Sequence, residues 1–480
     1  MTEKLIRKDE NTIEVPIGYK AGMRVPGLIY LNAQLEKFLE PQAVAQVANV
    51  STLPGIVGYS LAMPDIHTGY GFPIGGVAAF DLNEGIISPG GVGYDINCGV
   101  RLLRSNLTKQ EVLPHIKDLV AAIYANVPSG VGSKGKIRLT PDEQKNVVLK
   151  GALWAVEQGM GSGADLEKTE SEGMMSGVDE TSISEKAYER GRNQMGTLGS
   201  GNHFIEIQYV SEIFNEKAAQ AFGLFEGQVT VMIHTGSRGL GHQVCTDFLP
   251  IMERASKKYG IELYDRELAC APFHSQEAEE YFSAMKGAAN YAWANRQSIM
   301  HLVSESFIAA LRGSPSSIGL SLVYDVAHNI AKEETHRVGK RDVRLIVHRK
   351  GATRAFPKDH PELPDIYRAV GQPVLIPGDM GRASFVLIGT QDAMTETYGS
   401  TCHGAGRLLS RHGAIKAAKG RQIWKELLDA GVTVTSAGRG TLAEEMPEAY
   451  KNINNVISVV DNARISQKVA MLKPIGVVKG

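Results

Sequence analysis

The stretch Pro89-Gly-Gly-Val-Gly-Tyr-Asp-Ile-Asn-Cys-Gly-Val-Arg101 places Asp95 and Cys98 three residues apart inside a glycine-rich loop. Glycine allows positive φ and a close approach of the backbone to an ion or a phosphate. A hard carboxylate and a soft thiolate at this spacing can share a metal ion. Cys98 can equally be a small buried hydrophobe, because free cysteine often packs in that way. The remaining ligands would have to come from other parts of the chain.

The composition excludes some classes of function. The chain has 480 residues, a formal net charge of -1 and 21% charged residues, so no overall basic field indicates a nucleic-acid binder. A polyanionic partner would therefore meet a local basic patch. The four cysteines form no CxxC pair, which favours reduced thiols over a disulfide framework. The 52 glycines indicate many tight turns.

No targeting signal is visible in the first residues. Met-Thr-Glu-Lys-Leu-Ile-Arg-Lys-Asp-Glu lacks the apolar core of a signal peptide, and no run approaches the roughly 18 apolar residues of a membrane span. The sequence therefore predicts a cytoplasmic protein without a membrane segment.

Short apolar runs and helical patterns alternate along the chain. Helices are predicted at 34–49, 106–126, 141–157 and 276–311, and the second half of the chain predicts a further helix from the 399–407 loop to about residue 430. Strands are predicted at 13–16, 25–30, within 56–80, and at 202–210, 228–234, 320–324, 343–348, 374–377 and 385–389. Residues 158–185 lack periodicity and predict a mobile surface loop or insertion. The length allows two or three domains or one large body.

Three histidines lie in or beside apolar strand-like runs. His203, His234 and His328 would each need partners for both ring nitrogens, and a metal ion satisfies one of them. Each can instead be a core histidine bonded only to protein. With Asp95 and Cys98 they make five ligands of mixed hardness, which is more than one ion needs and favours a two-metal cluster of Mn²⁺ or Zn²⁺.

Two glycine loops have the character of anion sites. Residues 399–407, Gly-Ser-Thr-Cys-His-Gly-Ala-Gly-Arg, precede an apparent helix, so backbone N–H groups and Arg407 would meet phosphate oxygens, with His403 facing a phosphorus atom. Residues 377–384, Pro-Gly-Asp-Met-Gly-Arg-Ala-Ser, form a similar loop. A plain glycine-rich turn explains either loop equally well, since neither is a Walker A or Rossmann fingerprint.

Basic residues cluster in the second half of the chain. Arg407, Arg411 and the group at 416–421 fall partly on one side of the predicted helix and would form a track for a phosphodiester backbone, or simply a solvated face. The C-terminal segment, residues 473–480, is apolar, so we expect it to pack against the rest of the protein and to bring Lys479 to a functional site.

Nine motifs, in order, resemble those of the RtcB family, the GTP- and manganese-dependent RNA-splicing ligases. The nine motifs are Pro64-Asp-Ile-His67, Gly93-Tyr-Asp-Ile-Asn-Cys-Gly99, Gly199-Ser-Gly-Asn-His-Phe-Ile-Glu206, His234-Thr-Gly-Ser-Arg-Gly239, Asp325-Val-Ala-His-Asn329, His348-Arg-Lys-Gly-Ala-Thr-Arg354, Pro377-Gly-Asp-Met-Gly381, Ser400-Thr-Cys-His-Gly-Ala-Gly-Arg407 and Lys473-Pro-Ile-Gly-Val-Val-Lys479. The resemblance implies an α+β fold, with residues 1–480 forming a single large catalytic domain of central sheets flanked by helices and a deep active-site cleft.

The resemblance also implies roles for individual residues. Cys98 would bridge two Mn²⁺ ions, Asp95 and His203 would complete one site, and His234 and His328 the other. His403 would attack the α-phosphorus of GTP, and no role follows for Asp65. The implied guanylate contacts are Asn202, Phe204, Glu206, Asn329, Pro377, Gly378, Asp379, Met380, Ser384, Gly404, Ala405, Gly406, Tyr450 and Lys479. Arg190, Arg238 and Arg411 would hold RNA phosphates.

The implied reaction joins RNA ends that carry a 2′,3′-cyclic phosphate or 3′-phosphate to a 5′-hydroxyl end, through a GMP–histidine and an RNA 3′-pp-5′-G end, in tRNA splicing or RNA repair. An activator protein of the archease type is a further expected partner. A two-metal phosphoesterase would use the same ligands but would need neither His403 nor a guanine pocket. An RNA-binding or chaperone role would need only the basic track.

Overall fold

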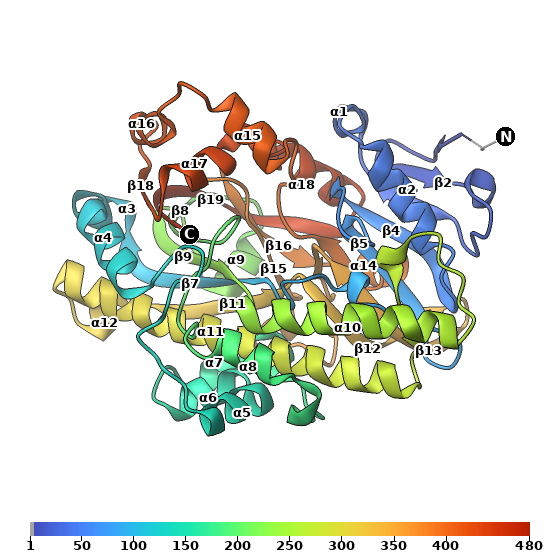
Figure 1. Cartoon of the computed structure of the whole chain (residues 1–480). Helices are drawn as coiled ribbons and strands as arrows, with labels where there is room; N and C mark the ends of the chain where they lie inside the picture. Colours follow the sequence, from blue (N-terminus) through green and yellow to red (C-terminus); the bar gives the residue numbers. More distant parts are fainter. Residues whose placement is uncertain (1–3) are drawn as a thin grey trace.

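Two large β-sheets form the centre of the computed structural model, which describes residues 4–480 (Figure 1). Residues 1–3 of the predicted domain lie outside the described residues. One sheet has the order β1 (Ile6–Arg7), β2 (Thr12–Val15), β3 (Gly27–Tyr30), β4 (Ile56–His67), β5 (Ile74–Asp81), β13 (Arg341–Lys350) and β12 (Asn329–Val338). The other has the order β11 (Ser321–Ala327), β7 (Gly99–Thr108), β9 (Gln228–Thr235), β8 (Phe204–Ile213), β19 (Ser466–Lys479), β16 (Ser384–Gly389) and β15 (Pro373–Ile376).

Three short pairings complete the strands. Strand β18 (Thr433–Ser436) runs parallel to β19, β6 (Ile86–Ile87) pairs with β10 (Ala271–Pro272), and β14 (Ala352–Arg354) pairs with β17 (Ser400–Cys402). The α+β class and the predicted strands are confirmed, with ends shifted by a few residues. The apolar run at Gln228–Thr235 is buried at every position, as expected for a central strand.

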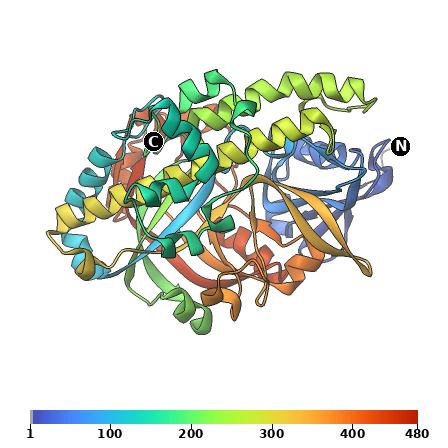
Figure 2. The ribbon, with the colours of Figure 1, turned by 90° about the horizontal axis from the view of Figure 1, so that it is seen from below.

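Two long helices, α10 (Arg238–Lys258) and α11 (Gln276–Leu311), lie across one side of the sheets (Figures 1 and 2). The predicted helix at 276–311 is confirmed, and the hydroxyl of Ser275 caps its first turn by accepting from the Ala278 amide. Most of α11 is buried, including Trp293 and Arg296, so this helix is the central support of the molecule.

Shorter helices cover the remaining faces. They are α1 (Ala33–Glu36), α2 (Pro41–Val50), α3 (Lys109–Val112), α4 (Ile116–Asn126), α5 (Pro141–Lys150), α6 (Ala152–Glu157), α7 (Gly163–Glu167), α8 (Glu185–Gly191), α9 (Glu216–Phe222), α12 (Pro315–Ile318), α13 (Asp365–Arg368), α14 (Gln391–Glu396), α15 (Arg411–Ala417), α16 (Ile423–Asp429), α17 (Arg439–Glu444) and α18 (Ile453–Asn462). In the part of the chain that the structure describes, none of the helices is both long and apolar enough to cross a membrane.

The helix predicted at 106–126 begins too early. Strand β7 continues to Thr108, where a capping box with Glu111 starts α3. Pro114 then lies in a short 3₁₀ turn before α4, because proline favours the first turn of a helix and cannot donate to a preceding carbonyl. The predicted helix is therefore divided among four elements: the end of β7, α3, the 3₁₀ turn and α4.

The segment 158–185 is more ordered than a plain loop. It contains α7 and the 3₁₀ turns Glu170–Gly173 and Glu180–Ser182. Glu170 is buried, and its carboxylate accepts from Lys332 Nζ at 2.6 Å and from the Ala327 amide at 2.9 Å. Glu170 therefore belongs to a buried ion pair with Lys332, not to a solvated loop.

The single helix predicted from residue 403 to about 430 is wrong. After β17 the chain forms an irregular turn at 403–410, and then α15 and α16 follow as separate short helices. Gly406 has φ +72 and Gly420 has φ +83, conformations that end helical geometry. The basic track predicted on one helix face therefore does not form: Arg407 precedes both helices, and Arg421 pairs with Glu426 and Glu448.

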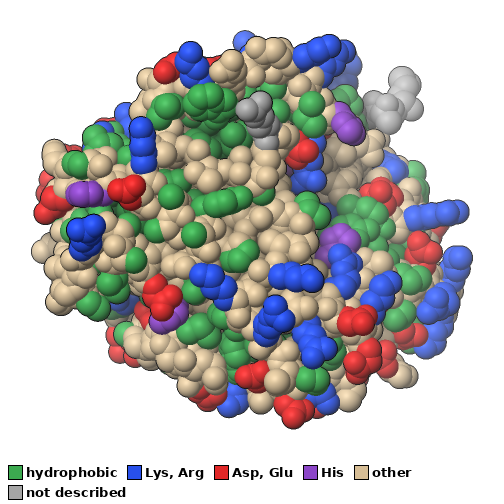
Figure 3. Space-filling view, turned by 60° about the vertical axis from the view of Figure 1, so that its left-hand side comes forward, with side chains coloured by type: hydrophobic (Ala, Val, Ile, Leu, Met, Phe, Trp, Pro, Cys, Tyr) green, Lys and Arg blue, Asp and Glu red, His purple; other side chains and the backbone are tan. Residues whose placement is uncertain are grey.

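The outer surface carries mixed charge. On the face in Figure 3, Lys and Arg side chains lie interspersed with Asp and Glu. This agrees with the near-zero net charge and leaves local sites, rather than a general field, to recognise an anionic partner.

Candidate active site

The histidine and cysteine candidates meet because four neighbouring strands end together. Strands β11, β7, β9 and β8 are adjacent and antiparallel, with Gly99 opposite both Ala327 and Thr235, and Phe204 opposite His234. Cys98 directly precedes β7, His203 directly precedes β8, and His328 directly follows β11. One edge of the sheet therefore carries these side chains together with His234.

The loop before β7 turns sharply enough to bring Asp95 to Cys98. The Cys98 amide donates to the Asp95 carbonyl at 2.9 Å, and Asn97 between them has φ +49, a conformation that asparagine tolerates better than most residues. Arg296 on α11 donates to the Asn97 carbonyl at 2.8 Å and the Thr235 carbonyl at 3.0 Å. The same guanidinium holds both carboxylate oxygens of buried Asp325, so the loop is fixed from the core.

The ligand atoms of Asp95, Cys98 and His203 all lie within 4.8 Å of one another. His203 Nε2 is 2.9 Å from Asp95 Oδ2 and 3.6 Å from Cys98 Sγ. On the other side, Cys98 Sγ is 3.2 Å from His234 Nε2, and the rings of His234 and His328 lie 5.4 Å apart. The structure thus brings the five predicted ligands together, with Cys98 in the middle.

The donor atoms fit divalent metal ions. His203 Nδ1 lies 3.1 Å from the Leu198 carbonyl and donates to it, so a metal ion would bind at Nε2, in place of the hydrogen bond that Nε2 makes to Asp95. The buried Nε2 of His328 has no hydrogen-bond partner among residues 4–480, whereas its Nδ1 bonds Thr353 Oγ1 at 3.0 Å. A buried nitrogen without a partner is costly unless a ligand satisfies it. Carboxylate, imidazole and thiolate together suit Mn²⁺ or Zn²⁺.

Burial controls protonation in this cluster. Burial, with repulsion from neighbouring histidines, lowers the pKa of His234 and of His328 well below the ordinary value, so both are neutral ligands. Burial alone would raise the pKa of Asp95, but His203 and Arg238 lower it to about 2. The carboxylate is therefore ionised at neutral pH.

His403 is held by Asp65, for which the sequence alone suggested no role. Asp65 Oδ2 accepts from His403 Nδ1 at 2.6 Å, from the His403 amide at 2.9 Å and from the Gly404 amide at 3.2 Å. Burial opposes ionisation of Asp65, but the charge and hydrogen bonds of His403 outweigh it and lower the pKa of the carboxyl. Because Nδ1 is the donor to Asp65, Nε2 is the nitrogen that carries the lone pair when the ring is neutral.

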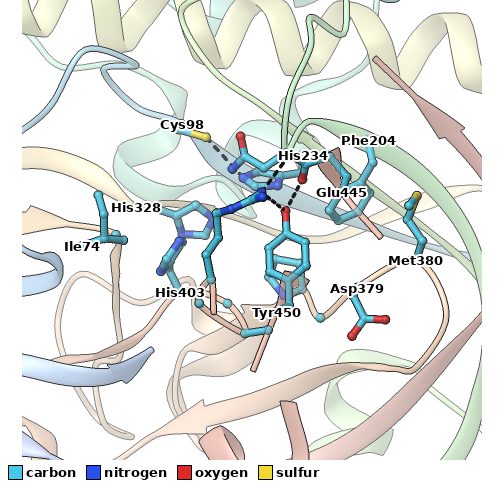
Figure 4. A pocket seen from close by; sticks show the side chains of 18 of the residues that line it. Ile74, Cys98, Phe204, His234, His328, Asp379, Met380, His403, Glu445 and Tyr450 are labelled. Atoms are coloured by element: carbon cyan, nitrogen blue, oxygen red, sulfur yellow. Dashed lines mark hydrogen bonds and ion pairs between the residues drawn. The ribbon is translucent and has the colours of Figure 1, made fainter. Parts of the chain in front are cut away.

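One cavity joins this histidine to the metal candidates (Figure 4). Cys98, His234, His328 and His403 lie on one side, and Phe204, Met380, Glu445 and Tyr450 on the other. The predicted residues that line the cavity are Cys98, Asn202, Phe204, Glu206, His234, His328, Asn329, Pro377, Gly378, Asp379, Met380, His403, Gly404, Ala405, Gly406, Arg411, Tyr450 and Lys479. The predicted residues outside the lining are Asp95, His203, Ser384, Arg190 and Arg238.

A group of buried charges forms the far wall of the cavity. Glu445 Oε1 accepts from Arg407 Nη1 at 2.9 Å, and Oε2 accepts from Tyr450 Oη and lies 3.7 Å from Lys479 Nζ. Glu445 was absent from the sequence prediction because a glutamate in a polar helical segment gives no local signal. Arg407, predicted to pair a phosphate, is instead bound to this carboxylate.

Glu206 is the second carboxylate of that wall. Burial raises its pKa to about 7, although the Gln208 amide and nearby Lys479 favour the ionised form. Gln208 Nε2 donates to Glu206 Oε2 at 2.8 Å and to Ser384 Oγ at 3.1 Å, so Ser384 acts one layer behind the cavity. Such a carboxyl accepts hydrogen bonds from a base edge when ionised.

The loop at 377–384 is shaped by its own polar atoms. Asp379 Oδ1 accepts from the amides of Gly381 and Arg382, both at 3.1 Å, and the Gly378 amide donates to Ser384 Oγ at 3.1 Å. A Cβ at Gly378 would lie 1.7 Å from the Ala383 carbonyl oxygen, so only glycine fits there. The loop thereby presents Pro377 to Met380 to the cavity in one conformation.

Three arginines were predicted to hold RNA phosphates, and they differ in position. Arg411 lines the cavity and lies against Gly201. Arg238, at φ +54, lies against Gly199, and its Nε donates to Thr197 Oγ1 at 3.4 Å. Arg190 is exposed and contacts the start of α10. The three arginines therefore lie at different depths, and only Arg411 is part of the cavity lining.

Comparison with known proteins adds independent information. A family model described as tRNA-splicing ligase RtcB matches residues 46–480. Curated relatives of that name include proteins from Thermococcus kodakarensis and Archaeoglobus fulgidus, each 56% identical, and from Methanococcus maripaludis, 55% identical. The alignments cover 99%, 97% and 98% of this chain, and the same shares of the three relatives. Almost the whole chain therefore falls within the similarity to these relatives.

Proposed function

Because the chain belongs to the tRNA-splicing ligase RtcB family, an assignment that makes it an RNA ligase, we propose that it joins RNA 3′-phosphate or 2′,3′-cyclic phosphate ends to 5′-hydroxyl ends through a GMP–histidine. The observation that carries the proposal is the His403–Asp65 pair, in which Nδ1 is held at 2.6 Å and Nε2 remains free beside the metal candidates. A phosphoesterase would have no use for this second nucleophile.

The first step is the attack of His403 Nε2 on the α-phosphorus of GTP. The N–P bond forms, the bond to the β-phosphate oxygen breaks, and pyrophosphate leaves. The imidazole becomes positively charged when it is bonded to phosphorus, and the ionised Asp65 at Nδ1 stabilises that charge. Glu206, Lys479 and Tyr450 would hold the guanosine on the opposite wall of the cavity.

In the second step an oxygen of the RNA 3′-phosphate attacks the phosphorus of the GMP–histidine and displaces His403. The product is an RNA 3′-pp-5′-G end. The 5′-hydroxyl oxygen then attacks the 3′-phosphorus and its proton passes to solvent, the bond from that phosphorus to the bridging oxygen breaks, and GMP leaves as the new phosphodiester forms. Where the RNA end carries a 2′,3′-cyclic phosphate, water first opens it to the 3′-phosphate. His403 returns to its free state, ready for the next GTP.

Divalent ions fit this site and would neutralise phosphate charge there. Asp95, Cys98 and His203 would hold one ion, and Cys98, His234 and His328 the other. We propose two Mn²⁺ ions, with Arg190, Arg238 and Arg411 on the RNA phosphates. The archease-type activator and the cytoplasmic location stay predictions.

Incubation with α-³²P GTP and Mn²⁺ tests the proposal. The wild type should retain label after denaturation, and His403→Ala should retain none. His301→Ala, on the exposed side of α11, is the matched control and should label normally. An unlabelled wild type that still hydrolyses a 2′,3′-cyclic phosphate would instead identify a two-metal phosphoesterase.

A further inference from the structure

We propose that Tyr70, Tyr94 and His242 form a stacking platform for the first bases of the RNA strand that carries the 5′-hydroxyl. We call these three side chains the aromatic platform. The inference rests on the proposed function for its choice of strand, but it concerns a surface outside the cavity that holds His403 and the guanylate residues.

The three rings come together from separate parts of the chain. Tyr70 lies between β4 and β5, Tyr94 in the loop before β7, and His242 in the second turn of α10. The ring centroids of Tyr70 and Tyr94 are 5.4 Å apart at 69°, and those of Tyr94 and His242 are 5.0 Å apart at 33°. Tyr70 and Tyr94 are half-buried and His242 is exposed, so ring surface remains open to solvent.

The platform is held rigidly from below. Buried Lys350 donates through Nζ to the carbonyl of Tyr70 and, at 3.1 Å, to the carbonyl of Gly90, which ties the two tyrosine loops together. The Gly71 amide donates to Glu267 Oε2 at 2.7 Å. A preorganised ring surface loses little entropy when a base stacks on it.

A cation lies at the edge of the platform. Arg190 Nη1 donates to Gln243 Oε1 at 2.9 Å and lies 3.4 Å from His242 Nδ1, while the arginine itself is exposed. Aromatic rings beside a fixed positive charge are the arrangement with which proteins bind single-stranded nucleic acid, because bases stack while phosphates meet the cation. Packing alone would not require an arginine at this edge.

The platform adjoins the open side of the metal candidates. Tyr94 directly precedes Asp95, whose side chain is 30% exposed, although Cys98 and His203 are buried. Asn329, which lines the cavity, donates to the Asp95 carbonyl at 3.0 Å. A strand stacked on Tyr94 would therefore end next to the Asp95 carboxylate.

In-line geometry selects the 5′-hydroxyl strand. In the ligation step the attacking oxygen lies opposite the leaving GMP. The guanylate residues and His403 line the cavity together with Cys98, whereas Asp95 and the three rings of the platform are not part of its lining. The proposal therefore assigns the leaving GMP to the cavity and the 5′-hydroxyl strand to the platform.

Binding of a 5′-hydroxyl RNA oligonucleotide without a 3′-phosphate tests this inference by fluorescence anisotropy, with Mn²⁺ and without GTP. The partner probe is the same oligonucleotide with abasic sites at its first two nucleotides. In the wild type the abasic probe should bind roughly five- to a hundredfold more weakly. In Tyr94→Leu, and in Tyr70→Leu if the first variant does not fold, both probes should bind equally weakly.

Two controls sharpen the result. Tyr94→Phe keeps the ring and should bind as the wild type does. Tyr259→Leu removes a half-exposed tyrosine at the far end of α10, about 25 Å from His242 along the helix, and should also change nothing.

The inference is overturned if the abasic sites weaken binding as much in Tyr94→Leu as in the wild type, or if the variant loses affinity only for a strand ending in 3′-phosphate. Neither outcome depends on GTP. Self-labelling of the wild type with α-³²P GTP, measured on the same preparation, decides the proposed function separately.

Discussion

The two loops that meet at the active site are supported in opposite ways. The loop at 89–101, which bears Asp95 and Cys98, is fixed by the Arg296–Asp325 pair, whose side chains are both fully buried. The loop at 399–407, which bears His403, emerges from the three-residue strand β17 and depends on one carboxylate, Asp65, for three hydrogen bonds. A ligand loop fixed by a buried ion pair and a nucleophile whose ring is oriented by one carboxylate should fail differently on substitution.

The difference has a physical reason. Ligands of a metal pair must keep their separation, and a buried network with little freedom provides this. A nucleophile that forms and loses a covalent bond must reach different phosphorus positions, and a single oriented pair leaves the ring that freedom while fixing its tautomer. The predictions below probe this contrast.

Arg296→Met should break the support of the 89–101 loop. The substitution removes donors to the Asn97 and Thr235 carbonyls and leaves Asp325 with only Arg101 as an ionic partner. Loss of one partner of a buried pair costs about 3–5 kcal/mol of the free energy of unfolding. Thermal unfolding should show a large fall in Tm, and a Tm equal to that of the wild type would show that the loop does not depend on this pair.

Asp65→Asn should spare the fold and abolish most of the chemistry. The amide cannot stabilise a charged imidazole and does not hold the same tautomer, so the rate of self-labelling with GTP should fall by about 10²- to 10⁴-fold. Single-turnover labelling measures the rate, with Tm as the check on folding. A variant that labels at the normal rate would show that the carboxylate is only a structural cap.

Glu206 extends the comparison to the guanylate wall. Its pKa of about 7 means that the folded protein keeps this proton at lower pH and releases it as pH rises through 7. If the ionised carboxylate accepts from guanine, the affinity for GTP should fall about tenfold between pH 8 and pH 6. Glu206→Gln should bind more weakly at pH 8.

Glu206→Gln also serves as the control for the titration of GTP itself. The pH profile of Glu206→Gln reports only GTP and the other groups of the site, such as Lys479 and Asp379. Parallel profiles for the two proteins, measured by titration calorimetry, would show that Glu206 does not titrate in the binding reaction.

Local patterns predicted much of the fold. The period of α11 and the apolar run of β9 depend on neighbours in sequence, and the structure confirms both. The helix predicted after His403 failed because two glycines with positive φ interrupt a composition that otherwise favours helix. Helix propensity alone does not determine the residue at which a helix ends.

The site was harder to predict for a different reason. Cys98, His203, His234 and His328 meet only because β11, β7, β9 and β8 are adjacent in that order, and strand order is not written in the spacing of the residues. Family motifs supplied the set that spacing alone left open. Asp65 and Glu445 remained without roles because their partners, His403 and Arg407, come from segments far away in sequence.

The smallest expected effect completes the comparison of supports. Arg337 and Asp342 form an ion pair at 2.8 Å on the β12–β13 hairpin, with the same chemistry as Arg296 and Asp325, but their side chains are 63% and 61% exposed. Water already solvates both charges, so Arg337→Met should change the free energy of unfolding by less than about 1 kcal/mol. Its Tm, measured beside that of Arg296→Met, isolates the contribution of burial. Equal losses in the two variants would mean that position in the core does not distinguish the two pairs, and the contrast between the loops would lose its physical basis.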